Sequence, residues 1–186
     1  MTTQTKRIFT LPNILSMVRI AMIPAIAALY LYGQEVASAL MLVLSGVTDV
    51  VDGWYARRYN AVSDLGKALD PVADKLTQAV MLCCLASKHP ALKAPLMLLV
   101  AKEAFAAFSG MVVIRRTGWV PGAVWHGKVT TLLLYATMIL HAVWQDIPID
   151  VSNTTGIVCI VMMLTSMLLY AMRNFRAIRE VRQGGD

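Results

Sequence analysis

The sequence predicts an all-α integral membrane protein with six transmembrane helices, and three observations carry that prediction. Hydrophobic residues make up 58% of the 186 residues, and charged residues make up only 15%. The mean hydropathy is +0.61, whereas soluble domains carry about 25% charged residues. Apolar segments of about 18 to 25 residues also recur along the chain, which is the length that a helix needs to cross a bilayer.

Six apolar segments are expected to span the membrane as helices, because a helix satisfies its own backbone hydrogen bonds in lipid. They lie at about residues 12–32, 36–57, 71–88, 91–115, 129–146 and 153–173. The first follows Lys6 and Arg7 as a signal peptide would, but it is too long and contains Pro12, Arg19 and Pro24. We therefore expect an uncleaved first span and, since the connections are short, a single membrane domain over residues 1–186.

Basic residues gather at both ends of the chain and on alternate connections. They are Lys6 and Arg7; Arg57, Arg58 and Lys67; Arg115, Arg116 and Lys128; and Arg173, Arg176, Arg179 and Arg182. Because cytoplasmic loops are rich in lysine and arginine, both termini and the second–third and fourth–fifth connections are expected to face the cytoplasm. Membrane topology thus accounts for the net charge of +6, and nucleic acid is not an expected partner.

Acidic residues concentrate in one stretch, 49–74, which holds five of the eleven in the chain. On the second expected helix, Asp49 and Asp52 share one face at spacing i, i+3. Gly53 and Ala56 continue that face with almost no side chain, so that a ligand or another backbone can approach closely. A buried helix would normally place leucine or valine at these positions.

The third expected helix repeats the pattern. Gly66, Asp70 and Asp74 stand at i, i+4 and i+8, again a small residue followed by two acids. Since two helices joined by a short turn are antiparallel neighbours, the two acidic faces are expected to meet near the cytoplasmic end. The remaining acid, Asp64, lies off this pattern, and we expect it in the turn.

Four carboxylates gathered in this way favour a metal site. Each carboxylate costs on the order of 3 kcal/mol to insert into a membrane, and four together repel one another unless cations are present. Two divalent ions would balance the four charges, and an all-oxygen site suits Mg²⁺ or Mn²⁺. Two metals roughly 4 Å apart are typical of displacement at phosphorus.

Structural interpretations of the same acids remain open at this point. Asp70 followed by Pro71 is also a good helix N-cap with proline at the first helical position. The two acids of the second helix could instead pair with Arg57 or Arg58.

Two other functional classes explain the sequence less well. Intramembrane acids also mark ion or proton paths, but a carrier predicts polar residues throughout the bilayer, whereas here they gather at one face. A non-catalytic scaffold offers no reason for the spacing of the aspartates.

The spacing D49-x2-D52-G53-x2-A56-R57-x8-G66-x3-D70-x3-D74 resembles the signature of the CDP-alcohol phosphatidyltransferase family at every fixed position. The six-span architecture and L11-P12-N13 with R19 and P24 are similar to that family too. The segment G66-K67-x-L69-D70-P71-x-A73-D74-K75 most resembles the corresponding segment of bacterial phosphatidylglycerophosphate synthases. Eukaryote-type cardiolipin synthases share much of it.

The resemblance implies a role for each residue of the motif. Asp49, Asp52, Asp70 and Asp74 would bind two Mg²⁺ or Mn²⁺ ions. Asp74 would also act as general base, taking the proton of an acceptor hydroxyl as it attacks the β-phosphorus of a CDP-linked substrate. Gly53, Ala56 and Gly66 would leave room for the nucleotide, and Arg57 would bind its diphosphate.

It further implies transfer of a phosphatidyl group from CDP-diacylglycerol to glycerol-3-phosphate, which yields phosphatidylglycerophosphate and CMP. Alternatives are a cardiolipin synthase that uses phosphatidylglycerol, or another acceptor alcohol. A homodimer in the bilayer of a bacterial cytoplasmic membrane is expected, with the active site at the cytoplasmic ends of helices 2 and 3.

The acceptor phosphate calls for cations, and the sequence offers four candidates: Arg19, Lys67, Arg115 and Lys128. The positive-inside rule alone would also place Lys67, Arg115 and Lys128 at the cytoplasmic face. Arg19 lies within a span, and its side chain either faces the protein interior or snorkels toward the membrane surface. Where phosphatidylglycerophosphate synthases often carry an Arg-Glu pair, this chain has Lys102-Glu103, and it has G127-K128-V129-T130-T131 where they have Gly-Lys-x-Lys-Thr. These departures leave the acceptor open.

Overall fold

The computed structural model describes residues 11–58, 64–118 and 125–183; within its helices the side chains of 11–13, 52–57, 64–68 and 180–183 lie outside the description. These ranges contain six α-helices and one short 3-10 helix. In chain order they are α1 (Leu11–Leu31), α2 (Glu35–Arg58), α3 (Asp64–Lys88), η1 (Pro90–Leu92), α4 (Lys93–Thr117), α5 (Trp125–Val143) and α6 (Ile149–Gln183). The prediction of an all-helical chain is confirmed for the described residues.

The largest differences between the helix boundaries and the expected spans occur at two helix ends. α3 begins at Asp64 rather than near residue 71, and α6 continues to Gln183. Within the described ranges, three segments are long and apolar enough to cross a membrane, judged by length and composition: Ile14–Leu31, Pro90–Thr117 and Ile149–Arg179. A count of six spans, and the orientation of the termini, stay predictions.

The early start of α3 corrects one interpretation of the aspartates. Asp70 and Pro71 both lie inside the helix, so Asp70 is not its N-cap. Proline has no N–H to donate to the residue four positions earlier, yet helices with neighbours in a membrane protein tolerate this loss. Because the helix is continuous through Pro71, Asp70 and Asp74 share one face, as the i, i+4 spacing predicts. Asp64 is the first residue of α3 rather than part of a turn.

The chain divides into two compact units. Unit 1 comprises Met1–Leu85 and Met138–Asp146, and unit 2 comprises Ala86–Thr137 and Ile147–Asp186. Unit 1 thus holds α1, α2, most of α3 and the end of α5, while unit 2 holds α4, α6, η1 and the greater part of α5. The single membrane domain over residues 1–186 stays a prediction.

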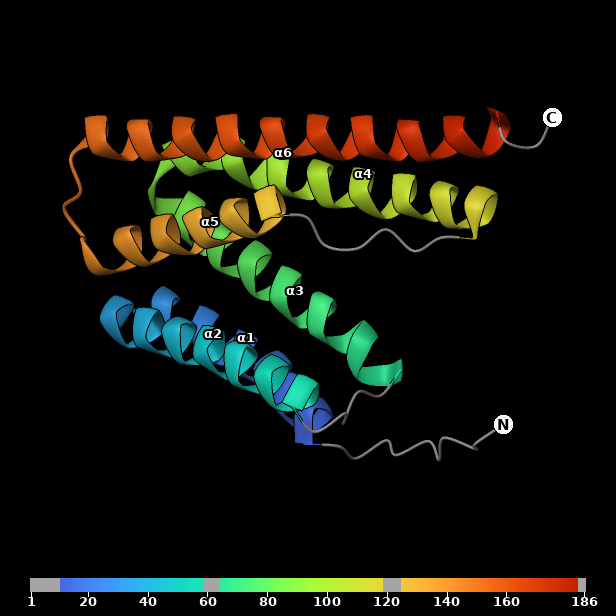
Figure 1. The fold of residues 1–186 in the computed structure, drawn as a ribbon. Helices are drawn as coiled ribbons and strands as arrows, with labels where there is room; N and C mark the ends of the chain where they lie inside the picture. The colour runs from blue at the N-terminus through green and yellow to red at the C-terminus, as the bar shows by residue number, and fades with distance from the viewer. Residues whose placement is uncertain (1–10, 59–63, 119–124, 184–186) are drawn as a thin grey trace. The chain divides into compact units, whose positions relative to one another are not determined.

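In unit 1, α1 and α2 form an antiparallel hairpin with a tight turn (Figure 1). Gly33 has φ +80°, a conformation that side chains rarely adopt. The Gly33 N–H donates to the Tyr30 carbonyl at 3.1 Å, and the Gln34 N–H donates to the Leu29 carbonyl at 2.8 Å. This glycine ends α1 and reverses the chain, so that α2 returns along α1.

Each helix of unit 1 buries one stripe of residues three or four positions apart, as expected for a helix with one inward face. The buried stripes are Ser16, Arg19, Ile23, Ile26 and Tyr30 on α1; Ser38, Leu42 and Ser45 on α2; and Ala73, Thr77, Met81 and Leu85 on α3. The Ser38 hydroxyl donates to the Ile26 carbonyl at 2.9 Å and links α1 to α2. Polar residues gather at one end of the α1 stripe, and that end carries the candidate site.

In unit 2, α4 and α6 lie side by side and run in the same direction (Figure 1), and η1 packs against both. Close packing is possible at η1 because residue 156 of α6 is glycine. A Cβ atom on Gly156 would lie 3.0 Å from the Ala91 carbonyl oxygen. The backbones of α6 and η1 therefore approach to a distance that leaves no room for a methyl group.

Gly156→Ala is expected to destabilise the protein, because the added methyl must push the Ala91 backbone aside. Overpacking of this kind typically costs about 1–3 kcal/mol. The measurement is the thermal unfolding midpoint of the purified protein in detergent, and the midpoint of the variant should be lower than that of the wild type.

Gly110→Ala is the matched control, since Gly110 lies in α4 of the same unit and a Cβ there would meet nothing within 4 Å. Alanine favours a helix over glycine by about 1 kcal/mol, so this variant should be as stable as the wild type or more so. Equal midpoints for the two variants would contradict the close approach of α6 to η1.

Candidate functional site

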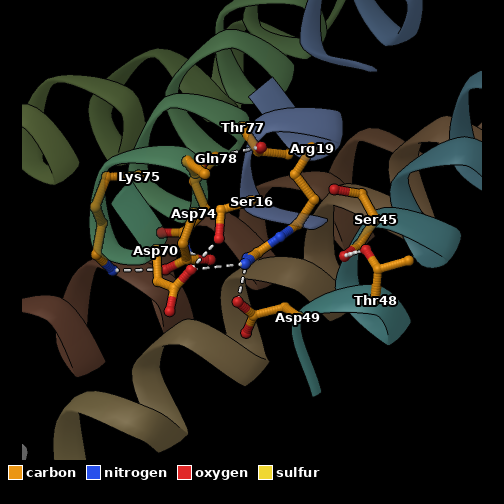
Figure 2. Close-up of polar contacts among 11 residues, drawn as sticks. Ser16, Arg19, Ser45, Thr48, Asp49, Asp70, Asp74, Lys75, Thr77 and Gln78 are labelled. Atoms are coloured by element: carbon orange, nitrogen blue, oxygen red, sulfur yellow. Dashed lines mark hydrogen bonds and ion pairs between the residues drawn. The ribbon is translucent and has the colours of Figure 1, made fainter. Parts of the chain in front are cut away.

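An arginine of α1 joins aspartates from α2 and α3 in unit 1 (Figure 2). One terminal nitrogen of Arg19, Nη1, donates to Asp49 Oδ1, and the other, Nη2, lies 3.3 Å from Asp70 Oδ1. The Ser16 hydroxyl, one turn before Arg19, donates to the same Asp70 oxygen. Three helices are thereby linked through one guanidinium group.

Asp74 lies one turn beyond Asp70 and has its own partners on α3. The Gln78 side-chain amide donates to Asp74 Oδ1 at 2.9 Å, and Lys75 Nζ lies 3.3 Å from Asp74 Oδ2. Gln78 is buried, with 1% of its surface exposed. A buried amide on one oxygen and an ammonium on the other hold this carboxylate in a defined orientation.

Burial differs sharply between the arginine and the acids. The Arg19 side chain is 2% exposed, whereas the side chains of Asp49, Asp70 and Asp74 are 45%, 37% and 22% exposed. The positive charge thus lies in the interior of unit 1, and the carboxylates remain partly open to their surroundings. A ligand could reach the acids without displacing the core.

The donors at this site are hard oxygens, which are the ligands that Mg²⁺ and Mn²⁺ prefer. Carboxylates of Asp49 and Asp70 already converge on one positive charge, that of Arg19. Among the described side chains no three His, Cys, Asp or Glu residues come close enough together to hold an ion, and the Asp52 side chain lies outside that set. Carboxylate oxygens suit a divalent cation, and Arg19 lies between two of the expected ligands, Asp49 and Asp70. A metal ion at this site stays a prediction.

The backbone of six other predicted site residues belongs to α2 or α3, but the structure does not describe their side chains. They are Asp52, Gly53, Ala56 and Arg57 on α2, and Gly66 and Lys67 on α3. Their roles as metal ligand, nucleotide cradle, diphosphate ligand and acceptor contact stay predictions.

The two acceptor candidates of unit 2, Arg115 and Lys128, are exposed. The buried polar residues of this unit include Lys102 and His126. Lys102 Nζ pairs with Oε1 of the half-buried Glu103 at 2.6 Å, and His126 Nδ1 lies 3.1 Å from Ser166 Oγ. His126 is thus engaged in packing between α5 and α6. The acceptor roles of Arg115 and Lys128 stay predictions.

Sequence reasoning missed two residues that support the aspartates, Ser16 and Gln78. A signal for each was present in the spacing. Ser16 precedes Arg19 by three positions and Gln78 follows Asp74 by four, so each shares a helix face with a residue already selected. Arg19 itself is confirmed to face inward rather than to snorkel.

The family model described as CDP-alcohol phosphatidyltransferase matches residues 9–173. This match includes all four motif aspartates, Arg19 and most of each unit. It also covers every residue that is labelled in Figure 2.

Curated relatives carry two activity names. The chain is 41% identical over 96 residues to the CDP-diacylglycerol–glycerol-3-phosphate 3-phosphatidyltransferase of Rickettsia bellii, covering 50% of this chain and 53% of that one. It is 32% identical over 151 residues to the Bacillus subtilis protein of the same name, covering 72% and 78%. It is 39% identical over 145 residues to the cardiolipin synthase (CMP-forming) of Streptomyces coelicolor, covering 74% and 67%. The chain spans about half the length of the Rickettsia relatives that it matches.

Gln78→Met is expected to lower stability, because it removes the hydrogen bond from a buried amide to the Asp74 carboxylate while nearly keeping the side-chain volume. A hydrogen bond to a charged group contributes about 1.5–3 kcal/mol, and less where water can replace it. The thermal midpoint should fall relative to that of Gln145→Met, since Gln145 is exposed. Equal midpoints for the two variants would show that the bond contributes nothing.

Proposed function

Since this chain belongs to the CDP-alcohol phosphatidyltransferase family, we propose that it transfers a phosphatidyl group from CDP-diacylglycerol to glycerol-3-phosphate, with Mg²⁺ as cofactor. The products are phosphatidylglycerophosphate and CMP. The observation that carries this proposal is the convergence of Asp49 and Asp70, from two different helices, on one buried cation. Two carboxylates held this close, with Asp74 one turn away, are suited to a divalent cation and a phosphate-bearing substrate.

The aspartates have distinct tasks in this proposal. Asp49, Asp52 and Asp70 hold the metal ions, of which two are expected, and Asp74 shares the site. The bound ions supply neutralisation of the charge on the diphosphate and on the departing CMP. The partial exposure of the three described carboxylates leaves them accessible to a substrate.

Asp74 is the general base of the proposed reaction. The acceptor oxygen forms a bond to the β-phosphorus of CDP-diacylglycerol, the bond from that phosphorus to the CMP oxygen breaks, and the hydroxyl proton passes to Asp74. The contacts from Gln78 and Lys75 hold the carboxylate in a defined orientation before the reaction. Such a base is weak, but it acts only as the new O–P bond forms.

A cardiolipin synthase that uses phosphatidylglycerol is the second candidate. It is favoured by the alignment with the Streptomyces coelicolor enzyme, which covers 67% of that relative. Both reactions share the donor, CMP release and the aspartate chemistry, and they differ only in the acceptor. We place either reaction in a bacterial cytoplasmic membrane, with the site facing the cytoplasm, as the distribution of basic residues predicts. A homodimer remains part of the proposal.

The test of the proposed function is CMP release by the purified protein in detergent. It receives CDP-diacylglycerol and Mg²⁺ together with glycerol-3-phosphate, phosphatidylglycerol or no acceptor. CMP is expected with glycerol-3-phosphate, together with a phosphatidylglycerophosphate product detected by mass spectrometry. Release with phosphatidylglycerol alone would establish the second candidate, and no acceptor-dependent CMP in any arm would refute both.

Asp74→Asn should lower the rate of CMP release by about 100-fold or more, the usual contribution of a general base, while Mn²⁺ binding persists. The Asn side chain keeps one oxygen ligand but cannot take a proton at neutral pH. Asp146→Asn, at an exposed position, is the control and should match the wild type in both measurements. A near-normal rate for Asp74→Asn would show that another group is the base.

A further inference from the structure

Arg19 is buried at the polar end of unit 1, within a segment apolar enough to cross a membrane. Its two terminal nitrogens reach aspartates on different helices, Asp49 on α2 and Asp70 on α3 (Figure 2). The side chain is therefore neither a snorkelling charge nor a surface ion pair. It forms the electrostatic centre of the three-helix arrangement.

Each partner in this group depends on the others. A buried guanidinium carries a desolvation cost that only well-placed anions offset. Two carboxylates that approach one another are in turn disfavoured by mutual repulsion unless a cation lies between them. Arg19 meets both requirements, and its planar fork suits two separate oxygens better than the point charge of a lysine.

The same two carboxylates are metal ligands in the proposed function, on which this inference rests. A carboxylate oxygen that accepts from a guanidinium is less available to an ion, and a second cation nearby is repelled. Arg19 and a divalent ion therefore compete for Asp49 and Asp70.

We propose that Arg19 is a built-in counter-cation. In the metal-free protein it holds Asp49 and Asp70 together and keeps α1, α2 and α3 assembled, and it gives up at least one of these carboxylates when the metal binds. The released guanidinium group then lies beside the metal site, where phosphate groups of a substrate are the anions at hand. Arg19 is in this sense a positioning residue that prepares the site for the ion.

The competition has a thermodynamic consequence that measurement can reach. If Arg19 stabilises the metal-free state more than the metal-bound state, its removal must destabilise the metal-free state more. By linkage, metal affinity must rise by the corresponding factor. A permanent ion pair, unchanged by the metal, predicts equal destabilisation of both states and no gain in affinity.

The experiment measures Mn²⁺ affinity by electron paramagnetic resonance on the purified full chain in detergent, for wild type and Arg19→Gln. Thermal midpoints are recorded in EDTA and in saturating Mg²⁺. Arg19→Gln should bind Mn²⁺ roughly three- to tenfold more tightly, the factor that corresponds to the net contribution of one ordinary hydrogen bond. Its midpoint should fall further in EDTA than in Mg²⁺. Arg176→Gln, at an exposed position on α6, should change neither quantity.

Arg19→Lys keeps the charge but not the two-pronged fork, so its affinity for Mn²⁺ should rise less than that of Arg19→Gln. This variant decides the question if Arg19→Gln fails to fold. Unchanged or weaker Mn²⁺ binding in a folded Arg19 variant would overturn the inference while leaving the proposed function intact. Failure of the wild type to bind Mn²⁺ would instead count against the metal site itself.

Discussion

The buried charge of Arg19 is the constraint on which the arrangement of unit 1 depends. A guanidinium that is 2% exposed requires anions within reach, and the chain supplies one from α2 and one from α3. Buried apolar side chains such as Ile26 and Leu42 form the body of the unit, and polar groups occupy the end near the arginine. Ser16 adds a hydroxyl donor to Asp70, so that this shared carboxylate has two partners on α1.

That arrangement connects the fold to the proposed chemistry. Helix packing brings Asp49 and Asp70 together on the Arg19 side chain, and Asp74 lies one helical turn beyond Asp70 on α3. Gln78 and Lys75, which contact the Asp74 carboxylate, lie on the same helix as Asp74. These two contacts orient the carboxylate, which suits the proposed role of a base.

Helix spacing accounts for what the sequence could predict and for what it could not. The i, i+4 relation of Asp70 and Asp74 is a property of one continuous helix, and it was predictable; the N-cap alternative failed because the helix continues through Pro71. The partners of Arg19 depend on how three helices pack. The sequence alone therefore does not distinguish an arginine that binds the acceptor phosphate from one that pairs with aspartates. Arg115 and Lys128 illustrate another limit, since residues that set topology and residues that bind phosphate are the same residue types at the same face.

Anomalous X-ray scattering from crystals grown with Mn²⁺ tests the central claim most directly, namely that the α2 and α3 aspartates form a metal site centred where Arg19 now pairs with them. Peaks are expected beside the carboxylates of Asp49, Asp70 and Asp74, with Arg19 withdrawn from at least one of its two aspartates. Saturating Mn²⁺ that produced no peak there, with Arg19 still on both carboxylates, would contradict the account.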